Sequence, residues 1–208
     1  ISIEGGDIMM IHPKHLIVGC SERTSSNAVN EIIHTIFSKP LGIEKISVVK
    51  IAKNRAQMHI DTIFTQVKRN VWVLYGRYSE NIISAENKIK QSYLKQLMHQ
   101  PDLSAIEEPE VLQFFKPADQ LYQPDKDYRI DKKLSGIEEL LKQISTEDYN
   151  CKPGDVKIIY SGGNEFPYDD REQWTDSCNV VALKEGIVIG YDRNDFTANS
   201  FRKDGFDV

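Results

Sequence analysis

The stretch "DIMMIHPKHLIVGCSERTSSNAVNEII", residues 7–33, predicts the structural unit from which this chain is built. It begins as a strand, turns, continues as a second strand that ends at Gly19, and passes through a polar loop into a helix. Two strands this close in sequence pair as an antiparallel hairpin. We therefore expect a hairpin followed by a helix.

Two further segments have the same outline. Residues 61–92 repeat it around Gly76, and residues 179–204 repeat it around Gly190. The glycine follows the first residue of each segment by 12, 15 and 11 positions, and such differences fit into a hairpin turn. We expect each glycine to end a strand where the backbone turns sharply. Self-similarity of this kind indicates units that bury a face against their neighbours, although a hairpin followed by a helix is also a common motif.

The remaining segments complete a mixed pattern. Residues 93–135 are rich in Pro, Asp and Gln and predict an insertion or long loop. The segment "LSGIEELLKQIS", residues 134–145, predicts an amphipathic helix, and "VKIIYSGGN", residues 156–164, predicts a strand that enters a Gly-Gly loop. Strands thus alternate with helices. We predict an α/β (α+β) protein in which residues 1–208 form a single, partial catalytic domain, with approximately 93–135 as the insertion.

Composition limits the function classes. A hydrophobic share of 40% and a charged share of 27% are ordinary for a soluble globular protein. The net charge of −5 gives no electrostatic case for nucleic acid or an acidic membrane surface as partner. The three cysteines lack a disulfide-like pattern, and there is neither a signal peptide nor a run of about 18 apolar residues. The predicted compartment is the cytoplasm.

Both ends of the sequence read as interrupted elements. The first residues, "ISIEGGD", begin as if within a strand. The last, "RKDGFDV", follow the order helix, Gly, apolar, acid that "SKPLGIE" shows at 38–44 just before a predicted strand. We therefore expect this chain to be a piece of a longer protein.

The segment "AQMHIDTIFT", residues 56–65, contains the first candidate site residues. Its β-branched and aromatic residues predict a strand, on which His59 and Asp61 share one face. Simple exposure at a strand end would explain both as well as a site would. When the repeats are aligned, however, Glu4 and Asp7 fall at an equivalent strand start. Units packed around a common axis would bring these four polar groups together.

Clustered carboxylates repel one another unless a cation lies among them. A metal could use His59 and Asp61, and "HPKH" adds His12 and His15. Those two imidazoles fall in a predicted turn at the far end of the strand from Glu4, so we expect no metal. An organic guanidinium fits better, because its planar fork of N–H donors suits carboxylates.

Several motifs, taken in order, indicate a family. The first two are "EGGD" (4–7) and "SERTS" (21–25), in which Arg23 lies 19 residues after Glu4. The others are "MHIDTIFT" (58–65), and "REQW", "NVVAL" and "VIGYDRN" between 171 and 194. With these motifs the chain resembles the arginine deiminases of the guanidine-modifying (amidinotransferase) superfamily. The similarity runs through most of the chain and breaks at about 93–135. The resemblance implies the pentein fold, a propeller of five αββαβ units, of which about three are present here.

The resemblance also implies roles for five residues. Glu4 and Asp61 match the carboxylates that hold the guanidinium, and His59 matches the general acid/base. Arg23 matches the residue that pairs with the α-carboxylate of the substrate, and Asp7 belongs to the first motif, among the substrate-binding residues. The implied reaction is hydrolysis of L-arginine to L-citrulline and ammonia, with no metal or organic cofactor. A cysteine thiolate attacks the guanidinium carbon, and His59 protonates the leaving ammonia and then activates water.

Two positions of the family pattern are missing from this sequence. The cysteine nucleophile lies in a glycine-rich segment near the family's C-terminus, beyond residue 208, and a further substrate-binding Asp lies upstream of residue 1. We expect Cys178 to be a small buried thiol, Cys20 to pack at a strand end and Cys151 to lie in a loop. The chain by itself is therefore predicted not to turn over arginine. Because an incomplete propeller leaves sheet edges open, we also expect homo-oligomers.

Other activities remain as alternatives. Dimethylarginine hydrolysis, agmatine deimination and amidino transfer belong to the same superfamily. Agmatine lacks a carboxylate, so a substrate-binding Arg23 argues against it. A non-catalytic relative that binds arginine or a protein partner is the alternative from another class, and a missing or changed cysteine in the full gene would indicate it.

Overall fold

The computed structural model describes residues 2–53, 57–80, 109–117 and 131–208. Its α-helices are α1 (Ser26–Ser38), α3 (Ile137–Gln143), α4 (Tyr168–Gln173) and α5 (Asp195–Lys203). Its strands are β1 (Ile8–His12), β2 (His15–Cys20), β3 (Lys45–Lys50), β4 (Phe64–Lys68), β5 (Val71–Leu74), β6 (Glu110–Phe115), β7 (Lys132–Leu134), β8 (Lys157–Tyr160), β9 (Val181–Lys184) and β10 (Ile187–Ile189). Short turns of 3₁₀ helix are η1 (Gly5–Asp7), η3 (Ile60–Thr62), η4 (Gly76–Tyr78), η6 (Pro153–Asp155) and η7 (Ser161–Asn164), and η5 (Ile144–Asp148) is a π-helical turn.

The predicted repeat is present in the sheets. β1 and β2 form an antiparallel hairpin, α1 follows, and β3 returns parallel to β2, with His15 opposite Lys45. β4 and β5 form a second hairpin, and β8 lies parallel to β5. β9 and β10 form a third, followed by α5. The mixed α/β fold of repeated units is therefore confirmed; the helix predicted toward residue 92 lies outside the described residues.

The interval 93–135, predicted as an insertion or long loop, contains two strands. β6 pairs antiparallel with β3, with Leu112 opposite Val48, and β7 pairs with β6. The first sheet therefore has five strands in the order β1-β2-β3-β6-β7. The rest of the interval, 93–108 and 118–130, lies outside the described residues. The five-stranded sheet thus contains two strands from the segment between β5 and α3.

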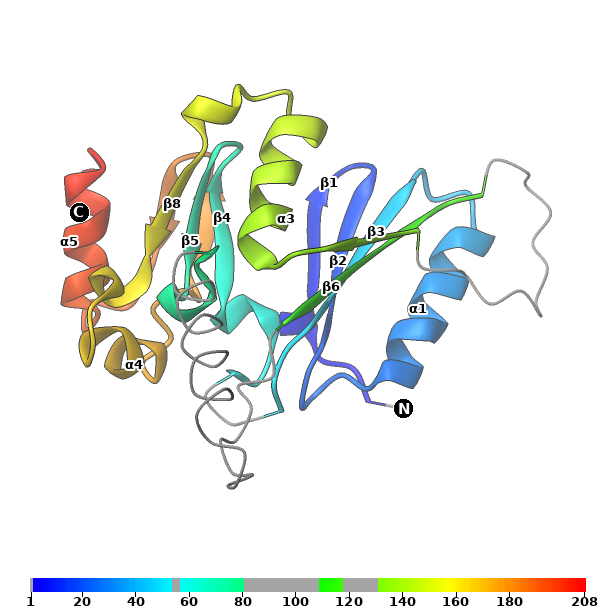
Figure 1. Cartoon of the computed structure of the whole chain (residues 1–208), viewed down its shortest axis with the longest axis horizontal. Helices are drawn as coiled ribbons and strands as arrows, with labels where there is room; N and C mark the ends of the chain where they lie inside the picture. The colour runs from blue at the N-terminus through cyan, green and yellow to red at the C-terminus, as the bar shows by residue number, and fades with distance from the viewer. Residues whose placement is uncertain (1, 54–56, 81–108, 118–130) are drawn as a thin grey trace, which may run out of the picture.

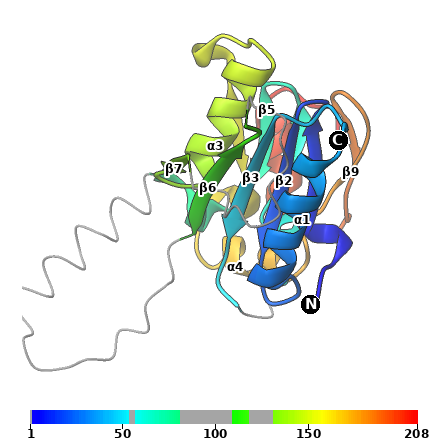
Figure 2. The same ribbon diagram turned by 90° about the vertical axis from the view of Figure 1, so that its right-hand side faces the viewer.

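Helices and sheets alternate across the molecule. Figure 1 shows α1 on one side of the five-stranded sheet and α3 on the other, with β4, β5 and β8 beyond α3 and α5 outermost. Figure 2 looks onto α1, which covers β2 and β3. This arrangement follows from alternation in β2: Leu16 and Val18 pack under α1, whereas Ile17 faces the core shared with α3.

The sequences of α1 and α3 explain why these segments form helices. In α1, Ala28, Val29, Ile33 and Phe37 form one buried stripe, and the Ser25 side chain caps the N-terminus by accepting the N–H of Ala28. In α3, the residues at helical spacing, Ile137, Leu140, Leu141 and the following Ile144, are fully buried. Within the described parts of the chain, no helix has the length and apolar character needed to cross a membrane.

The strand predicted over residues 56–65 is confirmed only at its end and is wrong over 57–63. β4 begins at Phe64, and Ile60–Thr62 forms the turn η3. The N–H and the hydroxyl of Thr62 both donate to the carbonyl of His59, at 3.2 and 2.7 Å, and close this turn. Short polar side chains compete with strand pairing in this way. The apolar residues that suggested a strand, Ile60 and Ile63, are instead buried in the core.

The three glycines of the repeat lie at or near strand ends, as predicted, but at Gly19 and Gly76 the reason for glycine is a close contact and not a sharp turn. Gly19 precedes the last residue of β2, and an added Cβ there would lie 2.1 Å from Oδ1 of Asp7. A Cβ at Gly76 would lie 2.1 Å from Oδ1 of Asn164. Neither glycine has a left-handed backbone conformation. Both positions therefore need glycine because a side chain from another segment packs directly on the backbone.

Candidate functional site

His59 and Asp61 form the centre of the candidate site. Nδ1 of His59 donates a hydrogen bond to Oδ1 of Asp61 across the turn η3. The imidazole and the carboxylate are 18% and 26% exposed, so both can be reached from solvent. Burial raises the pKa of the Asp61 carboxyl, and the hydrogen bond with His59 opposes that rise. The two predicted residues are thus brought together, by a turn and not by a shared strand face.

The first motif, "EGGD", packs directly against this pair. The turn η1 contacts η3, and Gly6 lies where an added Cβ would be 2.6 Å from Nδ1 of His59 and 2.7 Å from Oδ2 of Asp61. Two motifs more than 50 positions apart therefore form one surface. Sequence reasoning did not single out Gly6, although its place beside Glu4 was a signal.

Glu4 and Arg23 form an ion pair at the rim of this surface. Nη1 of Arg23 donates to Oε1 of Glu4 at 3.3 Å, and the side chains are 49% and 41% exposed. Nη2 of Arg23 contacts the sulfur of Met58, the residue before His59, at 3.4 Å. Among the described residues, the second oxygen of Glu4, Oε2, has no hydrogen-bond partner and is shielded from solvent. The Glu4 carboxylate thus binds a guanidinium, that of Arg23, with one oxygen and keeps the other unpaired.

Asp7 lies beneath the other four residues and is completely buried. The hydroxyl of Ser21 donates to its Oδ2 at 2.6 Å, and the backbone N–H of Ile60 donates to its Oδ1 at 3.0 Å. These contacts are all with the chain itself. Asp7 therefore joins the "EGGD" turn to the "SERTS" loop and to the turn of His59 and Asp61.

The segment "DREQW", residues 170–174, forms the C-terminal part of α4 and its C-cap, and its polar side chains reach three different elements. Asp170 accepts from the hydroxyl of Tyr75 at 2.7 Å and from Arg77 at 2.5 Å. Glu172 accepts the backbone N–H groups at the start of α5. The amide of Gln173 donates to the carbonyl of Thr62 in η3 at 2.9 Å. The sequence predicted no catalytic role for this segment, and these contacts are structural, although that of Gln173 supports η3.

The hydrogen bonds described above involve none of the three cysteine thiols. Cys178 is completely buried, and burial raises the pKa of its thiol to about 12. Cys20 is buried at the end of β2, and burial raises its pKa as well. Cys151 is partly exposed, and its thiol contacts the carbonyl of Tyr149. Since a nucleophile must be a thiolate, none of these positions favours nucleophilic chemistry.

His15, considered above as a metal ligand, is buried in a polar cluster far along β2 from Gly19. Its Nδ1 donates to Asp148 at 2.5 Å, and its Nε2 accepts from the hydroxyl of Ser47 at 2.8 Å. Ser47 is completely buried, so this Ser-His-Asp arrangement cannot receive a substrate. Both ring nitrogens are engaged. Among the described residues, no three His, Cys, Asp or Glu side chains gather in a metal-binding arrangement.

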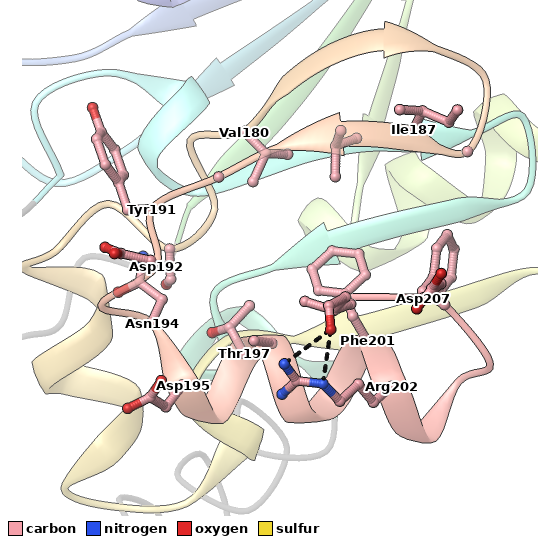
Figure 3. A pocket seen from close by; sticks show the side chains of 17 residues that line it. Val180, Ile187, Tyr191, Asp192, Asn194, Asp195, Thr197, Phe201, Arg202 and Asp207 are labelled. Carbon is pink, nitrogen blue, oxygen red and sulfur yellow. Dashed lines mark hydrogen bonds between the residues drawn. The ribbon is translucent and has the colours of Figure 1, made fainter.

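A cavity of about 680 Å³ lies elsewhere, between β10 and α5 (Figure 3). Val188, Thr197, Phe201 and Val208 are among its lining residues, whereas none of the five candidate residues lines it. The volume is suitable for a ligand. Polar groups converge instead at η1 and η3, and we place the candidate site there.

The fold consists of repeated strand–strand–helix units, and an imidazole, carboxylates and an arginine lie together between two of them. This combination is typical of the guanidine-modifying superfamily, whose pentein fold is present here in part. A family model described as arginine deiminase matches residues 1–208, and the chain belongs to this family.

Curated relatives agree with this assignment. The arginine deiminase of Mycoplasma capricolum subsp. capricolum is 29% identical over 208 residues, which are 100% of this chain and 41% of the relative. That of Bacillus cytotoxicus is 28% identical over 211 residues, with 99% and 42% covered, and that of Staphylococcus aureus (strain MRSA252) is 27% identical over 208 residues, with 100% and 42% covered. The chain thus spans about two fifths of the length of these relatives.

Proposed function

We propose that this chain contributes the guanidinium-binding half of an arginine deiminase-type site, which hydrolyses L-arginine to L-citrulline and ammonia. The observation that carries this proposal is the contact of Gly6 with His59 and Asp61, because it places the "EGGD" turn and the imidazole–carboxylate pair on one accessible surface. Membership of the arginine deiminase family supports the same reaction class, cleavage of a guanidino C–N bond.

The roles follow from the position of each group. Asp61 and Glu4 bind the guanidinium N–H donors, and the ion pair of Glu4 with Arg23 is an internal example of such binding. His59, oriented by Asp61, protonates the leaving ammonia and then takes a proton from the attacking water. Arg23 at the rim exchanges Glu4 for the α-carboxylate of the substrate. No metal or organic cofactor is assigned to this proposal.

The nucleophile in this proposal is a cysteine thiolate other than those of Cys20, Cys151 and Cys178. The thiolate adds to the guanidinium carbon, ammonia leaves, and water releases citrulline and regenerates the thiolate. Burial and the raised pKa of Cys178 and Cys20 support their exclusion. We therefore propose that the 208-residue chain binds arginine without turning it over.

The test has two parts on the 208-residue chain. The first is an NMR titration with L-arginine, for which we expect saturable shifts of the His59 imidazole. Glu4→Gln should weaken this binding about tenfold, as expected for loss of a charge-assisted contact. Glu22→Gln is the matched control, since Glu22 is an exposed glutamate of the adjacent loop. Absence of saturable shifts, or equal effects of both variants, would overturn the proposed site.

The second part is an assay for citrulline, for which we expect none above background. Citrulline formation that His59→Ala abolishes would contradict the exclusion of the three cysteines, and mapping of thiol alkylation would then identify the nucleophile. The same titration with dimethylarginine tests the neighbouring activity within the superfamily: tighter binding than L-arginine would favour it.

We also propose that the chain self-associates in its cytoplasmic setting. Val181, Leu183 and Ile189 on the third hairpin are each more than half exposed. Among the described residues, β10 pairs only with β9, whereas β2 and β5 each pair on both sides. An open edge and an apolar face favour pairing with a second copy of the chain.

A further inference from the structure

One buried carboxylate connects the two halves of the candidate site. Asp7 is completely buried, and each of its oxygens accepts from a different segment: Oδ2 from the hydroxyl of Ser21 and Oδ1 from the N–H of Ile60. The second contact joins residues 53 positions apart. The backbone of Gly19 completes the enclosure, since it leaves no room for a Cβ beside Oδ1.

Ser21 links Asp7 by hydrogen bonds to the loop that contains Arg23. Its hydroxyl oxygen accepts the N–H of Arg23 at 3.0 Å and that of Thr24 at 3.1 Å, while its proton points to Asp7. The hydroxyl of Thr24 in turn accepts the N–H of Glu4 at 3.2 Å. The loop is therefore held from below by Asp7 and is tied back to the turn that carries Glu4.

A carboxylate is needed at this position because both of its oxygens must accept. The Ser21 oxygen already accepts two N–H groups, so its own proton must be donated outward. The N–H of Ile60 is also a donor. The NH₂ group of an asparagine would face one of the two donors and could not accept its proton. A buried donor without an acceptor lowers the stability of the folded state.

We propose that Asp7 is a positioning residue that fixes Arg23 and the His59–Asp61 turn in one arrangement, and thereby couples recognition of the α-carboxylate to recognition of the guanidinium. This inference rests on the proposed function and changes the role of Asp7 within it, since Asp7 touches no substrate. Ser21 connects Asp7 to the loop of Arg23 and Thr24, and the N–H of Ile60 connects it to the turn of His59 and Asp61.

The two branches can be separated with two ligands. L-arginine has both a carboxylate and a guanidinium, whereas agmatine lacks the carboxylate. In NMR titrations of the 208-residue chain, Ser21→Ala should weaken L-arginine about tenfold and leave agmatine within about twofold, because it releases the Arg23 loop, whereas the N–H of Asp7 still donates to the carbonyl of Glu4. Asp7→Asn should weaken both ligands about tenfold or more. Ser47→Ala removes another completely buried serine hydroxyl and is the matched control, with neither affinity changed.

A loss of general rigidity would affect both ligands equally in Ser21→Ala, and that result would overturn the proposal. If Asp7→Asn does not fold, the comparison of Ser21→Ala with Ser47→Ala still tests whether the link from Asp7 to the Arg23 loop affects binding of the α-carboxylate. Amide hydrogen exchange provides a readout without ligand. Asp7→Asn should accelerate exchange at Ile60, Arg23 and Thr24, and Ser21→Ala should accelerate it at Arg23 and Thr24 only.

Failure of the proposed function gives a different result from failure of this inference. If the unaltered chain binds neither ligand, the proposed function fails, and the exchange pattern alone tests the anchoring by Asp7. If the unaltered chain binds both ligands but Asp7→Asn leaves the Ile60 amide and both affinities unchanged, the proposed function stands and the role of Asp7 is wrong.

Discussion

The main chain at Gly6 lies directly against the imidazole of His59, where an added Cβ would be 2.6 Å from Nδ1. Real Cβ atoms do not approach other atoms so closely, so a side chain at this position must displace the imidazole or the turn that carries Gly6. The neighbouring Gly5 has nothing within 4 Å of the equivalent point. Two adjacent glycines of one motif thus differ in what they allow.

This difference yields the first prediction. Gly6→Ala should separate the His59–Asp61 pair from the "EGGD" turn and weaken L-arginine by more than about tenfold in the NMR titration, as expected for misplacing a charged contact. Gly5→Ala adds the same methyl group into open space and should leave binding within about twofold. Similar affinities for the two variants would show that the close approach of Gly6 is unimportant.

The second prediction concerns the start of α5. Glu172 is completely buried and accepts the N–H groups of Phe196 and Thr197, each at 2.8 Å, and the hydroxyl of Thr197 at 2.6 Å. A carboxylate at a helix N-terminus satisfies donors that have no partner within the helix. Glu172→Gln should lower the free energy of unfolding by about 1–3 kcal/mol, measured by urea denaturation.

Glu165→Gln is the matched control for this prediction. Glu165 lies seven residues earlier, just before α4, and is exposed. Exposed side chains without specific partners contribute little, so the free energy of unfolding should change by less than about 0.5 kcal/mol. Equal midpoints for Glu172→Gln and the unaltered chain would mean that the cap of α5 does not contribute to stability.

The third prediction is a dependence of stability on pH that arises at His15. Burial lowers the pKa of His15 below its ordinary value of 6.5, although Asp148 acts in the opposite direction, and Lys45 and His12 also lower it. Folded His15 therefore binds a proton less readily than unfolded His15. Below a pH of about 6.5 the unfolded chain takes up the extra proton, so stability should fall as the pH decreases from there toward the lowered pKa.

Thermal unfolding between pH 7.5 and 5 measures this effect. His15→Gln should reduce the slope of melting temperature against pH, because glutamine does not titrate. His34→Gln serves as the control, since His34 lies on α1 and is not one of the groups that shift the pKa of His15. An unchanged slope in His15→Gln would assign the pH dependence to other groups.

The fourth prediction concerns self-association through the third hairpin. Leu183 is 61% exposed on β9. Leu183→Lys should shift the chain toward monomer in light scattering, because a charge on an apolar face or open edge opposes pairing with a second copy. Phe166→Lys is the control: Phe166 is 79% exposed but lies outside the hairpin, just before α4. A monomeric unaltered chain would contradict the proposed association.

Much of the fold could be predicted from local patterns. Strand alternation in residues 7–20, the buried stripe of α1 and the apolar spacing in 137–144 all depend on near neighbours in the sequence, and each of these elements is confirmed. Short segments with mixed signals were predicted less well. Residues 56–65 have the composition of a strand, but hydrogen bonds from Thr62 to His59 make the turn η3 instead.

By itself, the sequence determined the repeat, the mixed α/β class, the membership of the arginine deiminase family and the candidate residues Glu4, Arg23, His59 and Asp61. Only the tertiary structure decided what surrounds them. It placed Asp7 beneath the surface, showed that Gly19 is needed for the approach of Asp7, and buried Cys178. The physical reason is that burial and hydrogen bonding between distant segments, such as Asp7 and Ile60, depend on how the units pack, which no local pattern contains.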